Sequence, residues 1–278
     1  MRGAEAAVRG TAVELSHEEY RTVWHALGLG ARHWNLELPG LPELTEQQHS
    51  AQVGSVLAGL RARGLADQRG FAPALADSLR LLASPAREIN GWVQADARPG
   101  GQGRSTPVRL LAGASGEWAV LAMLDERRLV VRTGPAGELC HAVARQLPER
   151  PAGPGSSVSV PSALLATPAP DGRAGLTGAQ LETRLVGGGV SPVDARSFAA
   201  MMRGPKLGGG KFGAAVRDRH GRRYSAGVAL VYLATERGGY TLQPLRGPDG
   251  SAWTTLAPAT LAQVAQRLCQ LLDTIQLG

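Results

Sequence analysis

The stretch Lys211–Leu233, with the sequence KFGAAVRDRHGRRYSAGVALVYL, decides the fold. It contains two largely apolar runs, Lys211–Asp218 and Arg223–Leu233, with the polar sequence Arg-His-Gly-Arg between them. Apolar runs on either side of a short glycine-containing turn are typical of a β-hairpin. We therefore predict adjacent antiparallel strands here, and not the strand–helix–strand order of a parallel sheet.

The sequence on both sides of this hairpin extends the same pattern. Two more strands are predicted at Tyr240–Leu245 and Ser251–Leu256, and the turns around them contain Gly-Gly and Pro-Asp-Gly. Two helices are predicted upstream, at Leu176–Val186 and Ser191–Arg203. A final helix begins at Pro258, and one of its faces is apolar. The residues on that face are Leu261, Val264, Leu268, Leu271 and Ile275.

The first half of the chain has the same order of elements. Ser16 and Glu19 are spaced as a capping box at the start of a helix, and Thr45 and Gln48 repeat this spacing. A third helix is predicted at about Pro73–Leu82. Leu139, Val143 and Leu147 indicate a closing helix. The strands predicted in this half are Trp34–Leu38, Glu88–Ala97, Pro107–Ala112, Glu117–Leu124 and Arg128–Thr133.

This repeated order predicts an α+β protein built from two similar halves. The halves either share one antiparallel sheet or face each other across a pseudo-twofold axis. We place the first half at residues 13–147 and the second at residues 156–278, within one compact domain. The proline-rich segment 148–155 is the predicted linker, and residues 1–12 are predicted to be a disordered N-terminal extension.

The net charge of the chain is strongly positive, but its distribution along the sequence does not indicate one kind of partner. The net charge is +7, and only Lys206 and Lys211 are lysines, while the other basic residues are arginines spread along the chain. Nucleic-acid-binding domains usually concentrate basic residues in one stripe and often add stacking aromatics. Aromatic residues are only 4% of this chain. Nucleic acid is therefore a disfavoured partner, and a regulator that binds it through a basic hairpin is kept as the alternative function.

The cysteines and the N-terminal segment favour a cytoplasmic location. Cys140 and Cys269 each lie on the apolar stripe of a predicted helix, so we expect two small buried side chains and no disulfide. The N-terminal segment lacks the continuous apolar core of a signal peptide. The longest apolar stretch, Val228–Ala234, is too short to span a bilayer, so no membrane partner is expected.

The sequence contains no recognisable catalytic or metal-binding pattern. The six histidines include no HExxH pair, and two cysteines cannot complete a zinc site. The segment Gly208–Gly213 lacks the spacing of a phosphate-binding Walker loop, so we interpret it as a flexible lead-in to a strand. We expect no enzyme activity, no metal and no cofactor.

Two other features bear on binding. The connection Asp96–Thr106 is longer than a normal hairpin loop, and such loops are either disordered filler or binding elements. Four tryptophans fall within predicted strands, and core packing is the favoured role for all of them. They are Trp34, Trp92, Trp118 and Trp253.

Taken in order, several segments make the chain resemble the EspG family, the cytosolic chaperones of ESX (type VII) secretion systems. The most specific of them is Gly208–Arg222, GGGKFGAAVRDRHGR, and the resemblance extends from about Val13 to Leu277. The other segments are Trp24–Gly30, Leu60–Leu65, Leu79–Ile89, Gly153–Pro161, Asp194–Arg196 and Trp253–Ala259.

The resemblance implies a central antiparallel sheet flanked by two helical bundles in quasi-twofold halves. It also implies a non-enzymatic role, in which the protein binds the tip of the PPE subunit of a secreted PE–PPE pair, or of an equivalent helical substrate, and keeps it soluble. The expected contact regions are the central sheet, the Asp96–Thr106 loop and the C-terminal half. By location, the candidate partner-binding residues are Arg98, Arg104, Arg109, Arg217, Arg219 and Arg223.

Overall fold

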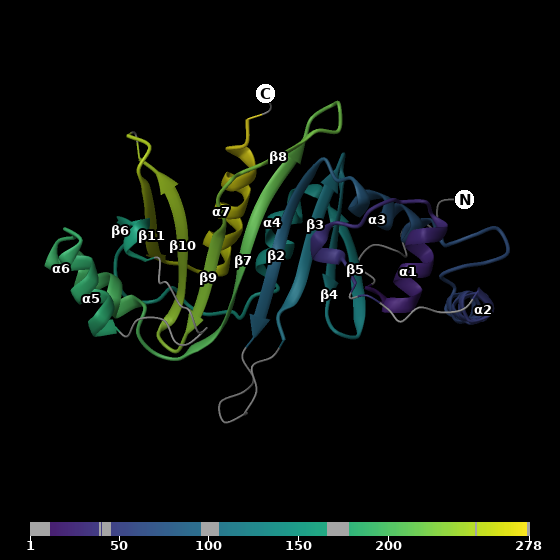
Figure 1. Cartoon of the computed structure of the whole chain (residues 1–278), viewed down its shortest axis with the longest axis horizontal. Helices are drawn as coiled ribbons and strands as arrows, with labels where there is room; N and C mark the ends of the chain where they lie inside the picture. The colour runs from purple at the N-terminus through teal and green to yellow at the C-terminus, as the bar shows by residue number, and fades with distance from the viewer. Residues whose placement is uncertain are drawn as a thin grey trace.

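The fold is organised around one antiparallel sheet that runs along the molecule (Figure 1). The computed structural model describes residues 12–38, 40, 46–95, 106–165, 178–247 and 249–276. The strand order is β1-β5-β4-β3-β2-β7-β9-β10-β11-β6, and β8 pairs with β7 outside this path. The strands are β1 (Val13–Ser16), β2 (Arg87–Ala95), β3 (Val108–Ser115), β4 (Trp118–Leu124), β5 (Arg128–Pro135), β6 (Val158–Pro161), β7 (Lys206–Arg217), β8 (Arg223–Ser225), β9 (Leu230–Thr235), β10 (Gly238–Arg246) and β11 (Ala252–Pro258).

Most of the helices begin and end where the sequence predicts. Ser16 and Glu19 form the predicted capping box of the first helix, and Ser191 caps the helix that starts at Pro192. The last helix starts three residues after Pro258, because Thr260 and Gln263 form a capping box there. The α-helices are α1 (His17–Ala26), α2 (Glu46–Ala62), α3 (Pro73–Ala83), α4 (Leu139–Ala144), α5 (Gly178–Gly187), α6 (Pro192–Met201) and α7 (Leu261–Asp273).

Strands β2 and β7 join the two parts of the chain at the middle of the sheet. They pair antiparallel from Arg87 opposite Val216 to Ala95 opposite Gly208. On one side of this seam all strands come from the first half of the chain, and on the other side all come from the second half. Because the paired residues are more than a hundred positions apart, no local sequence pattern specifies this contact.

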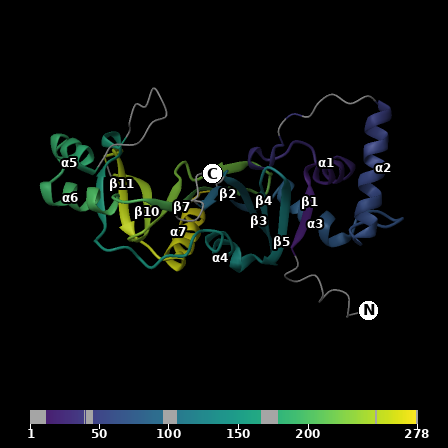
Figure 2. The ribbon, with the colours of Figure 1, turned by 90° about the horizontal axis from the view of Figure 1, so that it is seen from below.

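The helices cover the sheet in three groups, each with its own core. Helices α4 and α7 lie on one face, behind the middle of the sheet, and their core includes Ile89, Phe212 and Tyr232. On the other face, α1, α2 and α3 cover the strands of the first half. Helices α5 and α6 cover the outer strands of the second half on that same face. Figure 2 shows these two groups at opposite ends of the molecule.

Three sequence predictions about local structure are wrong. Trp34–Leu36 forms a short 3-10 helix, η2, and not a strand, because the side chain of the buried Asn35 donates hydrogen bonds to the carbonyls of Gly91 and Leu110. Gly208–Gly213 is an integral part of the long strand β7. The predicted strand Arg223–Leu233 is divided into β8 and β9, and Gly227 between them has a φ of 68°.

The prediction of unpaired cysteines is also wrong. Cys140 on α4 and Cys269 on α7 form a disulfide, with their Cα atoms 5.9 Å apart. Each cysteine does lie on the apolar stripe of its helix, but the two stripes face each other because α4 and α7 pack together behind the seam. The sequence, in which the residues are 129 positions apart, does not reveal that contact.

The segment predicted as the linker, 148–155, packs against β9 and β10. The hydroxyl of Tyr232 donates a hydrogen bond to the carbonyl of Pro148, and that of Tyr240 donates one to the carbonyl of Pro154. Gly153 lies so close to the Tyr240 ring that a Cβ atom there would be 2.1 Å from it. The predicted extension, residues 1–12, lies outside the described residues apart from position 12. No helix in the described parts of the chain is long and apolar enough to span a bilayer.

Candidate functional site on the open face of the sheet

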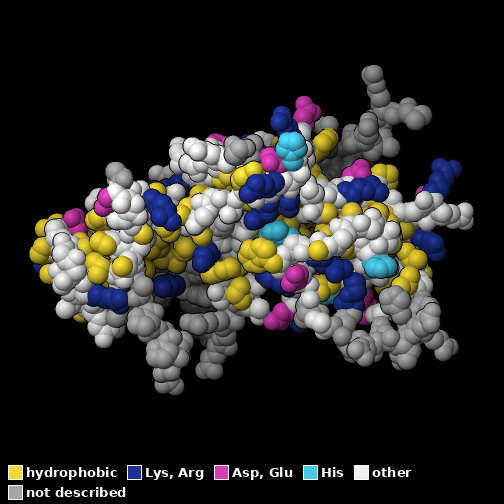
Figure 3. All heavy atoms as spheres, turned by 45° about the horizontal axis from the view of Figure 1, so that its top comes forward, with side chains coloured by type: hydrophobic (Ala, Val, Ile, Leu, Met, Phe, Trp, Pro, Cys, Tyr) yellow, Lys and Arg dark blue, Asp and Glu magenta, His cyan; other side chains and the backbone are white. Residues whose placement is uncertain are grey.

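Over the middle of the sheet, one face is left without a described α-helix, although the short helix η2 packs on part of β2 and β3 there. This face lies opposite α4 and α7, between the helical group of α1–α3 and that of α5–α6 (Figure 2). We call it the open strip and define it as the outward side of β2, β7, β8 and β9, together with Arg109 on β3. In Figure 3, basic and apolar side chains lie next to each other over the middle of the molecule. Such a mixed surface is suited to contact with another macromolecule.

The register of the strands places three large side chains in one row across the open strip. Trp92 on β2 is directly opposite Arg109 on β3 and directly opposite Lys211 on β7. Directly opposed side chains on a sheet share a face, with Cβ atoms about 4.5–5.5 Å apart. The row continues on the far side of Lys211 with the half-buried Val231 of β9. Trp92 is 37% exposed, and Lys211 is also exposed.

Glycines keep the strip shallow on both sides of Lys211. Gly209 and Gly213 alternate with Lys211 on the same face of β7. At Gly209 a Cβ atom would be 2.3 Å from the carbonyl oxygen of Tyr232, so the close approach of β9 requires glycine at this position. At Gly213 the nearest atom to a Cβ would be Oδ1 of Asn90, at 3.2 Å. A side chain there would fill the strip, and Asn90 would have to shift by a few tenths of an ångström to make room for it.

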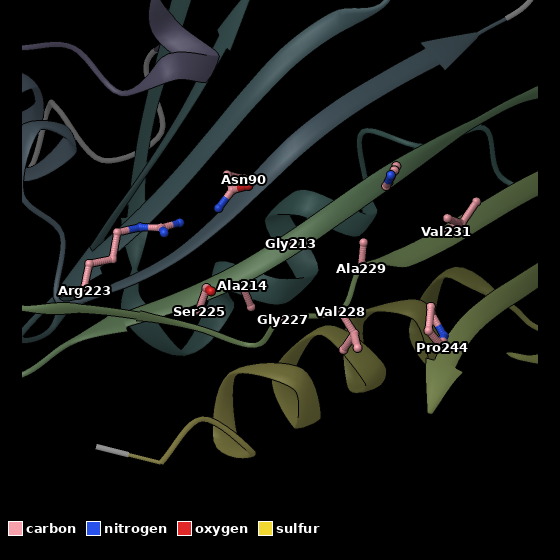
Figure 4. A pocket seen from close by; sticks show the side chains of 11 residues that line it. Asn90, Gly213, Ala214, Arg223, Ser225, Gly227, Val228, Ala229, Val231 and Pro244 are labelled. Carbon is pink, nitrogen blue, oxygen red and sulfur yellow. The ribbon is translucent and has the colours of Figure 1, made fainter. Parts of the chain in front are cut away.

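The strip is hollowed beside Gly213. The hollow has a volume of about 510 Å³, and Figure 4 shows the residues around it. Its polar and charged lining consists of Asn90, Lys211, Arg223 and Ser225, whereas Val228, Val231 and Pro244 contribute apolar surface. Of its two cations, Arg223 is already paired with Glu88, so Lys211 is the one available to a negatively charged group of a partner that also contacts the apolar side.

One buried carboxylate organises the upper part of the strip. Glu88 is 1% exposed, and its Oε1 accepts hydrogen bonds from Arg223 at 2.6 and 2.8 Å and from Asn90 at 3.2 Å. His33 Nε2 lies 3.3 Å from the same oxygen. Burial alone raises the pKa of Glu88, but the interactions with His33 and Arg223 outweigh it and lower this pKa to about 2. Glu88 therefore stays charged and fixes the position of the Arg223 guanidinium.

The structure brings only some of the predicted binding residues to this site. Arg109 and Arg223 lie on the open strip, and Arg217 is directly opposite Arg223 on the neighbouring strand. Arg219 lies beyond the end of β7, in the exposed turn before β8, where its guanidinium contacts His220. Arg98 and Arg104 lie outside the described residues, as does nearly all of the loop that contains them.

Two residues of the site, Trp92 and Lys211, are absent from the sequence-based candidates. The prediction that the tryptophans pack in the core is wrong, because the four side chains are 37–57% exposed. Alternation along β2 does place Trp92 opposite the face of Ile89 and Val93, but alternation does not show which face is covered. Lys211 is one of only two lysines in the chain, and that rarity was the only available signal.

The chemistry available at the strip is that of binding. Among the residues the structure describes, no group of three or more histidine, cysteine, aspartate or glutamate side chains is arranged to hold a metal ion. The only carboxylate on the strip, Glu88, is already held by Arg223. Exposed cationic and apolar side chains, such as Lys211 and Trp92, remain to meet a partner.

The fold places the protein in a structural class that includes a secretion chaperone. The chain is similar to the Mycobacterium tuberculosis type VII secretion system chaperone EspG5, whose structure was solved in complex with the PE25-PPE41 dimer. The TM-score is 0.66 and the identity is 15%, over 96% of this chain and 98% of that one. Among curated proteins, no sequence match to the chain is found.

The sequence itself identifies the family. The EspG family model matches residues 16–270, which is most of the chain. The protein therefore belongs to the EspG family, as the ordered segments of its sequence predict.

Proposed function

We propose that the protein is a chaperone of a type VII secretion system. It binds the tip of a PE–PPE type helical substrate on the open strip and keeps that substrate soluble for export. The observation that carries this proposal is the uncovered middle of the sheet, with Trp92 exposed at its centre, in a member of the EspG family. The structural neighbour EspG5 was solved with a PE25-PPE41 dimer, which supports the substrate class.

Physical reasoning supports a binding role for this strip. An exposed tryptophan beside half-buried apolar residues is costly to leave in water, and covering it releases free energy in proportion to the apolar area buried. A secreted helical protein with an apolar tip has the same need. In the complex the two apolar surfaces cover each other, so the chaperone and its client both become more soluble.

The proposed interface includes the predicted arginines where they can reach it. Arg109 and Arg223 lie on the strip and are expected to contact the client, and Arg217 is expected at its margin. Arg219 is expected to contact the client only if the client extends to the β7–β8 turn. Contacts from Arg98 and Arg104 stay a prediction from the sequence. The role is non-enzymatic, requires no cofactor and is carried out in the cytoplasm, in line with the family.

We also propose that two halves, residues 13–147 and 156–278, are related by a quasi-twofold axis between β2 and β7. The strand orders support this relation. From the outer edge to the seam, the first half runs β1-β5-β4-β3-β2 and the second runs β6-β11-β10-β9-β7. Each half has its first strand at the outer edge and ends in a helix that lies behind the seam. The axis would pass through the open strip and place it at the centre of the molecule.

The test is to block the strip without disturbing the fold. Gly213→Leu adds a side chain over the hollow, and Gly134→Leu is the matched control, because a Cβ at Gly134 would have no neighbour within 4 Å. Tagged wild-type and variant proteins are purified from their own host at about 0.15 M and about 0.5 M salt. We expect a PE–PPE type protein to co-purify with the wild type and the control at both salt concentrations. We expect the client to be reduced at least tenfold with Gly213→Leu.

Other outcomes count against the proposal. If Gly213→Leu retains the client, the strip is not the binding site. If nucleic acid co-purifies alone and is lost at the higher salt, the alternative function of a nucleic-acid-binding regulator is favoured, because phosphate-driven binding weakens steeply with salt. Thermal unfolding of both variants, with a midpoint close to that of the wild type, shows that the fold is intact.

A further inference from the structure

The charges on the open strip are unbalanced. Its cations are Arg109, Lys211, Arg217 and Arg223, and its only carboxylate is Glu88. Glu88 is buried and already bonded to Arg223. In the parts of the chain that the structure describes, neither Arg109 nor Lys211 has an acidic side chain within ion-pair distance. A partner that covers the strip must therefore satisfy at least these two cations.

The cost of leaving them unsatisfied constrains the partner. A purely apolar tip that covered Trp92 would also remove Lys211 and Arg109 from water without giving them a counter-charge. Burying an unpaired charge is much more costly than burying apolar surface is favourable. The partner that gains most from this surface has an apolar centre with a negative charge on each side.

We infer that the client's tip presents an apolar side chain to Trp92 and carboxylates to Lys211 and Arg109, and this inference rests on the proposed function. Arg109 and Lys211 are on the two strands that flank β2, so their backbones are about 10 Å apart. Helix residues i and i+7 are about 10.5 Å apart along the axis, with i+3 and i+4 between them on the same face. A helical segment that lies across the strands, with carboxylates at i and i+7 and apolar residues at i+3 and i+4, matches the row.

Nucleic acid matches the same row less well. Single-stranded nucleic acid is usually held by several aromatic side chains on which successive bases stack. Trp92 is the only aromatic side chain in the row Arg109–Trp92–Lys211–Val231. Two cations on either side of a single tryptophan are matched better by a partner that has two carboxylates on either side of one apolar side chain.

The experiment uses three stapled helical peptides of about twenty residues. All have leucine at i+3 and i+4, and they carry glutamate, glutamine or lysine at both i and i+7. Binding to the full-length chain is measured by fluorescence anisotropy. We expect the glutamate peptide to bind at least tenfold more tightly than the glutamine peptide, and the lysine peptide to bind most weakly. Oligo(dT) of twenty nucleotides is the nucleic-acid probe.

Variants of the chain assign the effect to the row. Lys211→Glu is expected to remove or invert the preference for glutamate, whereas Lys206→Glu, on the same strand, leaves it unchanged. Trp92→Ala is expected to weaken the glutamate and glutamine peptides by the same factor. Trp253→Ala is the matched control, because Trp253 is 37% exposed, like Trp92, but lies on β11.

The outcomes separate this inference from the proposed function. Equal affinity for the glutamate and glutamine peptides, or binding of none of the three, overturns the inference. The proposed function still stands in that case if Gly213→Leu loses its client in the host. Preferential binding of oligo(dT), abolished by Lys211→Glu, also overturns it, because the cations would then serve phosphates. If Lys211→Glu still prefers the glutamate peptide to the same extent, Lys211 does not contact a carboxylate of the client, and the inference is overturned.

Discussion

The two faces of the seam strands β2 and β7 differ although they are made of alternating residues of the same segments. On the closed face, Ile89, Val93 and Phe212 are buried against the core that includes α4 and α7. On the open face, Trp92 and Lys211, each next to one of these residues in sequence, are exposed. Successive residues of these strands therefore have different roles. Those on the closed face stabilise the fold, and those on the open face are available for binding.

Glu88 is an exception that shows the limits of this separation, and its neighbour on the same face, Asn90, is buried too. It lies on the same side of β2 as Trp92, yet it is as buried as the residues of the closed face. Its charge is accommodated by Arg223 and His33, which belong to elements far away in the sequence. This part of the open face therefore contributes to stability through a polar cluster and not through apolar packing.

The largest expected effect lies on the closed face. Phe212→Ala removes a fully buried ring from the core behind the seam. Such truncations typically reduce the free energy of unfolding by about 3–5 kcal/mol. Urea denaturation followed by circular dichroism measures this loss. A loss below about 1 kcal/mol would mean that the closed face is not the source of stability at the seam.

A smaller, pH-dependent effect is expected at Glu88. Its pKa is lowered from 4.5 to about 2 in the folded protein, so its contribution is complete above about pH 4.5 and is lost as the pH falls toward 2. At about 1.4 kcal/mol per pKa unit, the contribution is about 3 kcal/mol.

Glu88→Gln tests this contribution. It should be less stable than the wild type at pH 7, and the difference should narrow as the pH falls from 4.5 to 3, in urea titrations at each pH. Glu14→Gln, in an exposed ion pair with Arg128, is the control and should cost less than about 1 kcal/mol. A difference for Glu88→Gln that does not vary with pH would mean that its charge state is not what stabilises the cluster.

The smallest effect on stability is expected on the open face. Lys211→Ala should change the free energy of unfolding by no more than about 0.5 kcal/mol, because its exposed side chain has no ion-pair partner among the described residues. Differential scanning calorimetry of Lys211→Ala and Phe212→Ala, run in parallel, compares two consecutive residues of one strand directly. If Lys211→Ala lost as much stability as Phe212→Ala, the two faces of the strand would not have separate roles.

The sequence predicts the elements of this fold better than their contacts. Capping residues such as Ser16 and Ser191 and the glycine-containing turns are local signals, so most helices and strands could be predicted within a few residues. The pairing of β2 with β7 and of Cys140 with Cys269 depends on contacts between distant segments, which local patterns do not encode.

The candidate site was predictable only in part, for the same reason. Arg109 and Arg223 could be selected because they follow or border predicted turns and loops. Trp92 could not, because its alternation with Ile89 and Val93 is equally compatible with a strand covered on both faces. Its exposure follows from the positions of the two helical groups, which leave the middle of one face uncovered.

The disulfide between Cys140 and Cys269 changes how the chain is covalently connected. It closes a ring that contains all the strands from β6 to β11, and the first half of the molecule projects from this ring as a tail. A protease that cuts the oxidised chain once inside the ring therefore produces no separate fragments, whereas the same cut in the reduced chain produces two. Because reducing compartments disfavour disulfides, the redox potential of the surroundings decides whether a nicked molecule remains one covalent piece.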